Sequence, residues 1–111
     1  MRCLMFKPGQ IVGTQRTMNE AQISASVGGF PDIYCQGYRG KELLVYTGGH
    51  AAKSRGEDAN RIIDGREVYG TIVVVVDNLT PLMIEKFRVN NIFPRAIAAR
   101  SEPNKERRNA V

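Results

Sequence analysis

One run of aliphatic residues constrains the fold of this chain more than any other feature. Five consecutive β-branched residues, Ile72 to Val76, follow Gly70-Thr71 and end at Asp77-Asn78. Val and Ile favour extended backbone, and a run without polar alternation is typical of a strand covered on both faces. A buried helical segment has the same pattern, but the short length and the stop at Asp77-Asn78 favour a strand. We therefore predict that residues 68–77 form the central strand of one small sheet.

The size and composition of the chain favour a single folded domain. Its 111 residues can enclose one hydrophobic core, and 42% hydrophobic against 24% charged residues is typical of a folded protein. No apolar segment approaches the roughly 20 residues that a membrane helix needs. The apolar stretch near the N-terminus, residues 3–6, is too short for a signal peptide, so we expect a cytoplasmic protein.

Charge and cysteine content narrow the classes of partner and site. The net charge of +5 favours an anionic partner, whether nucleic acid, nucleotide or an acidic protein face, although part of the excess lies near the C-terminus. The two cysteines, Cys3 and Cys35, are too few for a disulfide framework and lack the spacing of a metal site. Both fall in predicted strands, where we expect buried thiols that behave as small hydrophobes; a bridge between neighbouring strands is the alternative.

Turn and capping residues divide the first half of the chain into four elements. Residues 2–7 are predicted as a strand that ends at Pro8-Gly9, and residues 10–16 remain ambiguous between a loop and a hairpin extension. Thr17 and Glu20 have the spacing of a capping box, which predicts a helix that ends before Gly28-Gly29. Two strands, 30–38 and 42–47, then form a hairpin.

The second half contains a long polar connection, the valine-rich strand and a helix. Residues 48–56 are predicted as a loop, residues 58–63 as a helical turn, and Asp64-Gly65 as a turn. Thr80 and Pro81 have the residue types of a helix start, and the last helix buries its apolar stripe. That stripe consists of Met83, Ile84 and Phe87. Ile92 and Phe93 are expected to anchor the chain on the core.

This order, β-α-β-β-β-α, predicts an α+β fold. We expect a single four-stranded, mainly antiparallel sheet with two helices packed mostly on one face. Residues 1–93 would form the compact domain, and residues 94–111 a basic C-terminal tail.

The turn and cap residues together resemble a known family. Pro8-Gly9, Val27-Gly28-Gly29, Asn60-Arg61, Gly70-Thr71 and Leu79-Thr80 occur in this order. The pattern PG…VGG…NR…GT…LT, which spans about residues 3 to 90, is similar to that of a family of small proteins of unknown function. This family is common in bacteriophages and other mobile elements.

The resemblance implies a setting and no chemistry. The sequence departs from the family pattern at two places. Phe-Pro-Asp follows the paired glycines, at residues 30–32, and the connection before Asn60 is unusually basic. The family has no settled activity, so no catalytic residue carries over. The implied setting is an accessory gene of a phage or mobile element that acts in the bacterial cytoplasm, where small phage proteins often inhibit or sequester host defence components.

The sequence argues against an enzyme and against a metal site. A Ser or Cys nucleophile needs a base, and His50, the only histidine, is expected to be exposed in a glycine-flanked loop. One histidine and two separated thiols cannot supply three or four metal ligands. Asp58, Asp64 and Glu67 could pair as an acid and a base, but carboxylates near turns are usually caps or solubilising groups. We expect no enzymatic activity, no cofactor and no metal.

The polar connection carries the candidate ligand-binding residues. Adjacent glycines expose backbone amides, and nearby cations could bind a phosphate, although no GKS/T ending marks a nucleotide-hydrolysing loop. Arg61 is the leading candidate because a guanidinium can hold a phosphate with two parallel bonds; an ion pair with Asp58 or Asp64 is the alternative. A flexible loop whose charges only keep it solvated remains the alternative for the whole segment. The predicted ligand-binding set is Gly48, Gly49, His50, Lys53, Arg55, Asn60 and Arg61.

Aromatic residues and the tail allow for nucleic-acid binding. Tyr34, Tyr38, Tyr46 and Tyr69 lie in predicted strands and could stack on bases, or pack as core-edge and cross-strand residues. Arg107-Arg108 in the tail could contact phosphates or remain solvated. No RNP-like motif supports the nucleic-acid reading.

Three functions follow as hypotheses. The first is a non-enzymatic counter-defence protein that sequesters an anionic, nucleotide-like ligand. The second is a protein–protein inhibitor of a host defence or nucleic-acid-processing complex, and the third is direct DNA or RNA binding through the tail. A homodimer is compatible with each, because a sheet this small leaves an edge or a face available.

Overall fold

The structure, a computed structural model, describes residues 1–94 as an α+β fold with three helices and seven strands. In chain order the elements are β1 (Arg2–Phe6), β2 (Thr14–Thr17), α1 (Glu20–Ser26), β3 (Asp32–Tyr38), β4 (Lys41–Thr47), α2 (Gly49–Ser54), β5 (Ala59–Ile63), β6 (Arg66–Tyr69), β7 (Ile72–Val75) and α3 (Pro81–Val89). Five strands form one sheet in the order β2-β1-β7-β4-β3, and β5 and β6 form a separate two-stranded sheet. The α+β class and the antiparallel pairing are confirmed. The predicted number of strands and helices is too low, because the prediction had one four-stranded sheet and two helices. The predicted basic tail, including Arg107-Arg108, lies outside the described residues except for Pro94.

The valine-rich run forms the middle strand of the five-stranded sheet. β7 pairs antiparallel with β1 on one side and with β4 on the other. The side chains of Ile72, Val73 and Val74 are fully buried. The predicted bounds of 68–77 are wrong at the N-terminal side because Gly70, at φ +77°, ends one strand before the next begins. Residues 68 and 69 therefore belong to β6.

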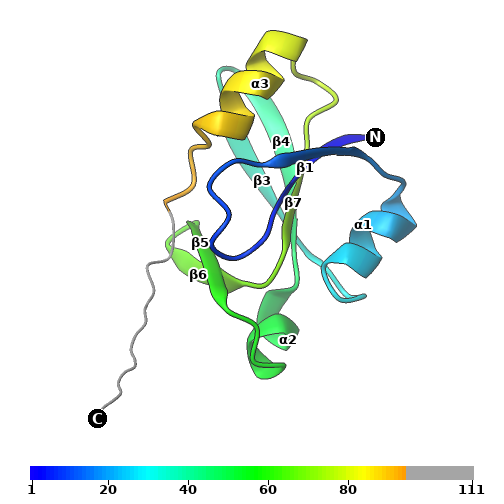
Figure 1. The fold of residues 1–111 in the computed structure, drawn as a ribbon, viewed down its shortest axis with the longest axis vertical. Helices are drawn as coiled ribbons and strands as arrows, with labels where there is room; N and C mark the ends of the chain where they lie inside the picture. Colours follow the sequence, from blue (N-terminus) through cyan, green and yellow to red (C-terminus); the bar gives the residue numbers. More distant parts are fainter. Residues whose placement is uncertain (95–111) are drawn as a thin grey trace.

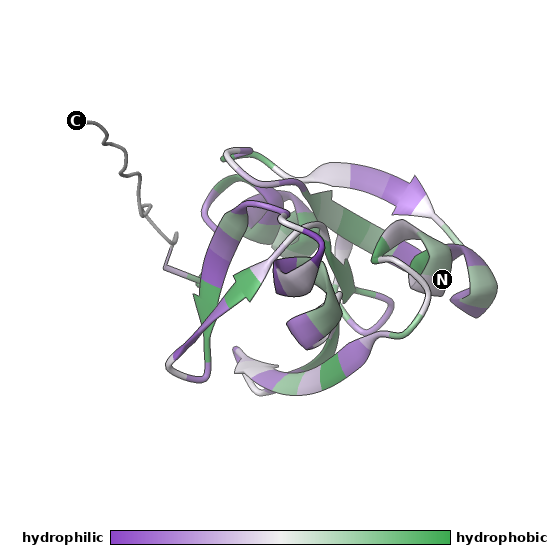
Figure 2. Cartoon of the chain, turned by 90° about the horizontal axis from the view of Figure 1, so that it is seen from below, coloured by the Kyte–Doolittle hydropathy of each residue, from purple (hydrophilic) through white to green (hydrophobic). Residues whose placement is uncertain are grey.

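The two faces of the sheet are covered by different elements. Ile23 and Val27 pack with Val73 on one face, and Phe87 of α3 packs with Val74 on the other. Figure 1 shows α1 on one side of the strands and the β5–β6 hairpin on the opposite side. Figure 2 shows hydrophobic residues concentrated in the inner strands. The prediction of helices mostly on one face is therefore wrong, because the unbroken valine run buries both of its faces.

The start of α1 lies two residues later than predicted. Thr17 pairs with Arg2 in the β1–β2 ladder, so it cannot cap the helix. Asn19 is the N-cap and forms a capping box with Gln22. The predicted end of the helix is confirmed, since Gly28 and Gly29 both have positive φ.

The β3–β4 hairpin and α3 agree with the sequence analysis. Arg39 and Gly40 both have positive φ, as a two-residue hairpin turn requires. The Thr80 hydroxyl accepts a hydrogen bond from the Met83 N–H, and Pro81 is the first helical residue. Phe93 is buried against Phe87, with 5.9 Å between ring centroids.

The cysteine prediction is only half correct. Cys3 is buried in β1, but Cys35 is exposed because it lies on the outer side of an edge strand. Neither thiol forms a disulfide. No helix in residues 1–94 is long and apolar enough to cross a membrane.

Residues 48–63 differ most from the prediction. The expected loop at residues 48–56 contains α2, and the expected helical turn at 58–63 is strand β5. Asp64-Gly65 is a turn as predicted, with both residues at positive φ, and it joins β5 to β6. This rearrangement brings α2 against β6 and creates the pocket described next.

Candidate functional site

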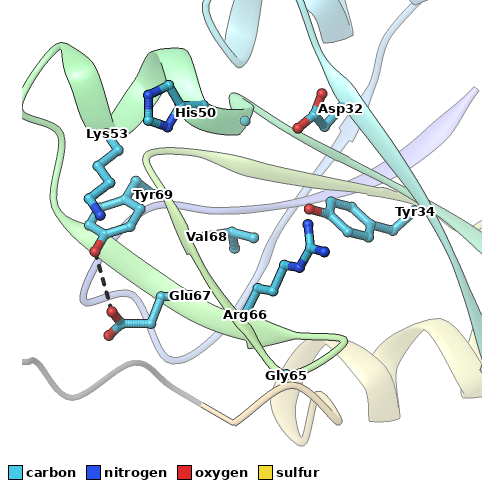
Figure 3. Close-up of a pocket in the computed structure, with 10 residues that line it drawn as sticks. Asp32, Tyr34, His50, Lys53, Gly65, Arg66, Glu67, Val68 and Tyr69 are labelled. Atoms are coloured by element: carbon cyan, nitrogen blue, oxygen red, sulfur yellow. Dashed lines mark hydrogen bonds between the residues drawn. The ribbon is translucent and has the colours of Figure 1, made fainter.

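A pocket of about 530 Å³ lies between α2, β6 and the first residues of β3. It combines two aromatic rings with basic and acidic side chains (Figure 3). Its lining residues are Asp32, Tyr34, Gly49, His50, Lys53, Gly65, Arg66, Glu67, Val68 and Tyr69. The volume falls within the range of about 300–1,000 Å³ that small-molecule sites occupy.

Helix and strand periodicities explain why these side chains meet. His50 and Lys53 are three residues apart in α2, so both side chains lie on the same face of the helix. Asp32 and Tyr34 are two residues apart in β3, so both point to the same face of the sheet. The tight turn at Asp64-Gly65 places the β5–β6 hairpin opposite both elements.

One wall of the pocket is a cation packed on an aromatic ring. The Lys53 ammonium nitrogen lies 5.5 Å from the centroid of the Tyr69 ring. The Tyr69 hydroxyl donates a hydrogen bond of 3.3 Å to Oε1 of Glu67 (Figure 3). Lys53, Tyr69 and Glu67 are thus linked in a chain of contacts along this wall.

The opposite wall holds a second cation and a second ring. Arg66 points toward Tyr34 in Figure 3. None of the ion pairs formed within residues 1–94 uses Arg66 or Lys53. Neither positive charge is therefore neutralised by a carboxylate within the described part of the chain.

Gly49 is required by close packing at the rim. Its φ is +61°, and a Cβ placed there would lie 2.6 Å from Oδ2 of Asp32. The Gly49 N–H donates to the Thr47 hydroxyl at 3.3 Å. The glycine thus leaves room for the Asp32 carboxylate, which lines the pocket and can accept hydrogen bonds.

The structure brings together three of the predicted ligand-binding residues, namely Gly49, His50 and Lys53. His50 is exposed as expected, but it lies on a helix and not in a loop. Gly48 is buried, and a Cβ there would lie 2.7 Å from the Val27 carbonyl oxygen. Arg55 is outside the pocket and pairs with Glu57 at 2.7 Å.

The other two predicted ligand-binding residues, Asn60 and Arg61, are structural. Arg61 is only 1% exposed, and its guanidinium donates to the Asn60 side-chain oxygen at 2.6 Å and to the Gln10 carbonyl at 2.7 Å. It also lies 5.1 Å from the Phe6 ring centroid. Asn60 is 2% exposed and donates to the carbonyls of Phe6 and Gly70, each at 2.8 Å. The structure therefore places Arg61, the leading sequence candidate for a phosphate ligand, inside the fold and outside the pocket lining.

A β-bulge explains why both side chains point inward. The β5–β6 register shifts between Ala59 and Arg61, so one extra residue interrupts the alternation of faces. Two consecutive polar side chains are buried as a result, one bonded to the other.

Arg66, the second cation of the pocket, is absent from the predicted ligand-binding set. Tyr34 and Tyr69 were predicted as possible base-stacking residues and Glu67 as a possible acid or base, but not as parts of one site. The signal that could have joined them is Asp64-Gly65, since Asp-Gly between two strand-like runs predicts a hairpin. That reading would have put Arg66 beside the turn and opposite the polar connection.

Within residues 1–94 no three His, Cys, Asp or Glu side chains are grouped so that they could hold a metal ion. Burial raises the pKa of Cys3 and of Tyr46 beneath α1, and a hydrogen bond from Arg88 lowers the pKa of Glu85.

Comparisons of the chain with models of protein families, with curated proteins and with solved structures each return no match. The likeness to a phage family stays a prediction. The candidate site therefore depends on its geometry alone.

Proposed function

We propose that this protein is a non-enzymatic binding protein for an anionic, nucleotide-like small molecule. The observation that carries the proposal is the pocket between α2, β6 and β3. Within it Lys53 and Arg66 supply positive charge beside the rings of Tyr69 and Tyr34.

Each part of such a ligand has a matching group. A phosphate would bind between Lys53 and Arg66, because ammonium and guanidinium groups make charge-assisted hydrogen bonds to phosphate oxygens. A base would stack on Tyr34 or Tyr69. The carboxylates of Asp32 and Glu67 would accept hydrogen bonds from ribose hydroxyls or a base amino group, and they would disfavour additional phosphates near the rim.

The same residues support binding without turnover. His50 is the single histidine of the chain and lines the pocket, but no cysteine and no serine line it with His50. We propose that a bound nucleotide is held intact, without a covalent intermediate on a serine or cysteine of the pocket. In the setting suggested by the family resemblance, we propose that this holding sequesters a nucleotide signal of host defence in a bacterial cytoplasm.

Ligand binding can be tested by calorimetry with a panel of nucleotides. The panel includes cyclic dinucleotides, mononucleotides, ADP-ribose and inorganic phosphate. We expect at least one nucleotide to bind and to raise the unfolding temperature, because a ligand that binds only the folded state stabilises it. Arg66→Gln and Lys53→Gln should each weaken binding about tenfold, the equivalent of roughly 1.4 kcal/mol for a lost charge-assisted contact.

Matched controls separate the pocket from general charge. Lys86→Gln replaces an exposed helical lysine of α3, and Arg16→Gln replaces an exposed strand arginine of β2. Both should bind the same nucleotide as the unaltered chain does. The proposal fails if no nucleotide binds, or if the control variants weaken binding as much as the pocket variants. Recovery of a hydrolysed nucleotide after incubation would overturn the non-enzymatic part.

A further inference from the structure

The strand β3 leaves one edge of the five-stranded sheet unpaired among residues 1–94. It pairs with β4 along all seven of its residues and has no neighbour on its other side. An open edge presents backbone N–H and C=O groups to any strand that can pair with them. Proteins normally shorten or charge such an edge. The opposite edge follows this rule, because β2 has four exposed residues that include Arg16.

The β3 edge lacks these protections. Its only charged residue, Asp32, stands at one end, and no lysine or proline interrupts the strand. On its outer face Ile33 is 51% exposed, and Leu44 of β4, which pairs with Cys35 on the same face, is 40% exposed. Phe30, just before the strand, is 87% exposed. An apolar surface therefore continues from the open edge onto the sheet.

We propose that β3 pairs antiparallel with β3 of a second copy of this chain, about a two-fold axis at Cys35. In this register residues whose numbers sum to 70 lie opposite each other, so that the large Ile33 faces the second copy's Gly37. The space beside Gly37 is open, since no atom lies within 4 Å of a Cβ built there. The large Ile33 side chain thus meets a glycine on each side of the axis, which makes this pair self-complementary.

The charges of the strand match the same register. Asp32 lies opposite the second copy's Tyr38, whose hydroxyl can donate to a carboxylate and which precedes Arg39. The acidic start of each strand would therefore meet the basic turn of the other. The opposite orientation, with parallel strands, would place Asp32 beside Asp32 and lose this complementarity. A second copy consequently fits the edge better than an unrelated acidic or basic strand.

The oligomeric state of the full chain tests the proposal directly. Analytical ultracentrifugation over a wide range of concentrations should show a monomer–dimer equilibrium. Ile33→Lys should raise the dimer Kd about tenfold or more, because the substitution occurs twice across the axis and places a charge at the edge. Ile11→Lys is the matched control, since Ile11 is 55% exposed in the loop between β1 and β2. It should leave the Kd unchanged.

Cysteine crosslinking tests the register. In the unaltered chain a short reagent with two thiol-alkylating groups, such as a bis-maleimide, should join Cys35 to Cys35, while the buried Cys3 stays unreacted. In a Cys35→Ser background, Ile33→Cys chains mixed with Gly37→Cys chains should crosslink. Neither alone should do so, because four residues of strand, about 13 Å, separate each cysteine from its equivalent.

Either of two results overturns the pairing. A chain that remains monomeric at every concentration would mean that β3 does not bind a second copy. A dimer that keeps its Kd in Ile33→Lys, or that crosslinks Ile33→Cys to itself, would use another surface or register. Nucleotide binding is measured separately, since Ile33 lies on the opposite face of β3 from the pocket residues Asp32 and Tyr34.

Discussion

At the scale of single residues, the buried side-chain amide of Asn60 connects several parts of the fold through three hydrogen bonds. It donates to the carbonyls of Phe6 and Gly70 and accepts from Arg61, so it joins β1, β5, the turn before β7 and a buried guanidinium. A buried carbonyl or guanidinium that loses its partner retains the full cost of desolvation. The dipeptide Asn60-Arg61 thus stabilises the fold, and its charge does not reach the pocket.

Replacing Asn60 should therefore destabilise the protein strongly. We expect Asn60→Ala to lower the free energy of unfolding by about 3 kcal/mol, because two carbonyls and one guanidinium lose a partner at once. Urea denaturation measures this change. Asn78→Ala is the control, since Asn78 is exposed and donates a single bond of 2.8 Å to the Glu42 carbonyl. It should cost less than about 1 kcal/mol. Equal losses in the two variants would contradict the structural role assigned to Asn60.

The Tyr46 hydroxyl gives the protein a specific alkaline sensitivity. Burial raises its pKa above the ordinary value of 10.0, and the nearby Glu20 carboxylate adds to the shift. A group whose pKa is higher in the folded state contributes its full stability below the unfolded pKa and loses it as the pH rises toward the folded pKa. The unaltered chain should therefore lose stability above about pH 10 for this reason.

Tyr46→Phe removes this titration. We expect the variant to be slightly less stable at neutral pH, since it lacks the hydrogen bond of 3.5 Å to Glu20. Its stability should fall less steeply above pH 10, so the difference between the two proteins should narrow there. Urea denaturation at a series of pH values measures both curves. Parallel curves throughout the alkaline range would show that Tyr46 does not titrate differently in the folded state.

At the scale of elements, Gly70 decides how the valine-rich region divides. The glycine has φ +77°, and a Cβ there would collide with the Glu57 carboxylate. Gly70→Ala should therefore combine backbone strain with displacement of the Glu57 carboxylate from its ion pair with Arg55, and we expect a loss of about 2 kcal/mol. Gly9→Ala is the matched control, since Gly9 has φ +82° with no atom within 4 Å of its added Cβ. It should cost about 1 kcal/mol, from strain alone. Thermal or urea unfolding compares the two.

Elements whose ends are marked by local chemistry were predictable from sequence. The β3–β4 hairpin depends on a positive-φ turn at Arg39-Gly40, and α3 begins with a capping threonine followed by proline. α2 lacks such marks, because its N-cap is Gly48 and no side chain caps it. A helix of six residues is held by tertiary packing, here through buried Ala52, and not by its own propensity. Strand β5 was hidden for a related reason, since its bulge breaks the alternation that marks a strand.

The same limit applied to the candidate site. Gly49, His50 and Lys53 were found because glycines and cations cluster in sequence. Arg66 and Tyr34 join them only through tertiary structure, when the β5–β6 hairpin folds against α2 and the start of β3. Residue type therefore indicated a basic site, while its location depended on the packing of elements that are distant along the chain.

At the scale of the whole molecule, the order of strands implies a gradient of stability. β7 is bonded on both sides and buried on both faces, whereas β2 is a short exposed edge. Local openings range from nearly no cost at such edges to the full free energy of unfolding in core strands. The gradient should be visible in native-state amide hydrogen exchange.

We expect the bonded amides of β7 to exchange at least about a hundredfold more slowly than those of β2, and to follow global unfolding as urea is added. Similar rates in the two strands would contradict a core built around the valine run.

The β3 edge supplies a second comparison within the same experiment. Its outward amides should exchange as quickly as those of β2 in dilute protein, and slow down as the concentration rises, because pairing with a second copy protects them. In Ile33→Lys the concentration dependence should disappear while the slow exchange of β7 persists. Slow exchange of β3 at every concentration would instead mean that another part of the same chain covers this edge.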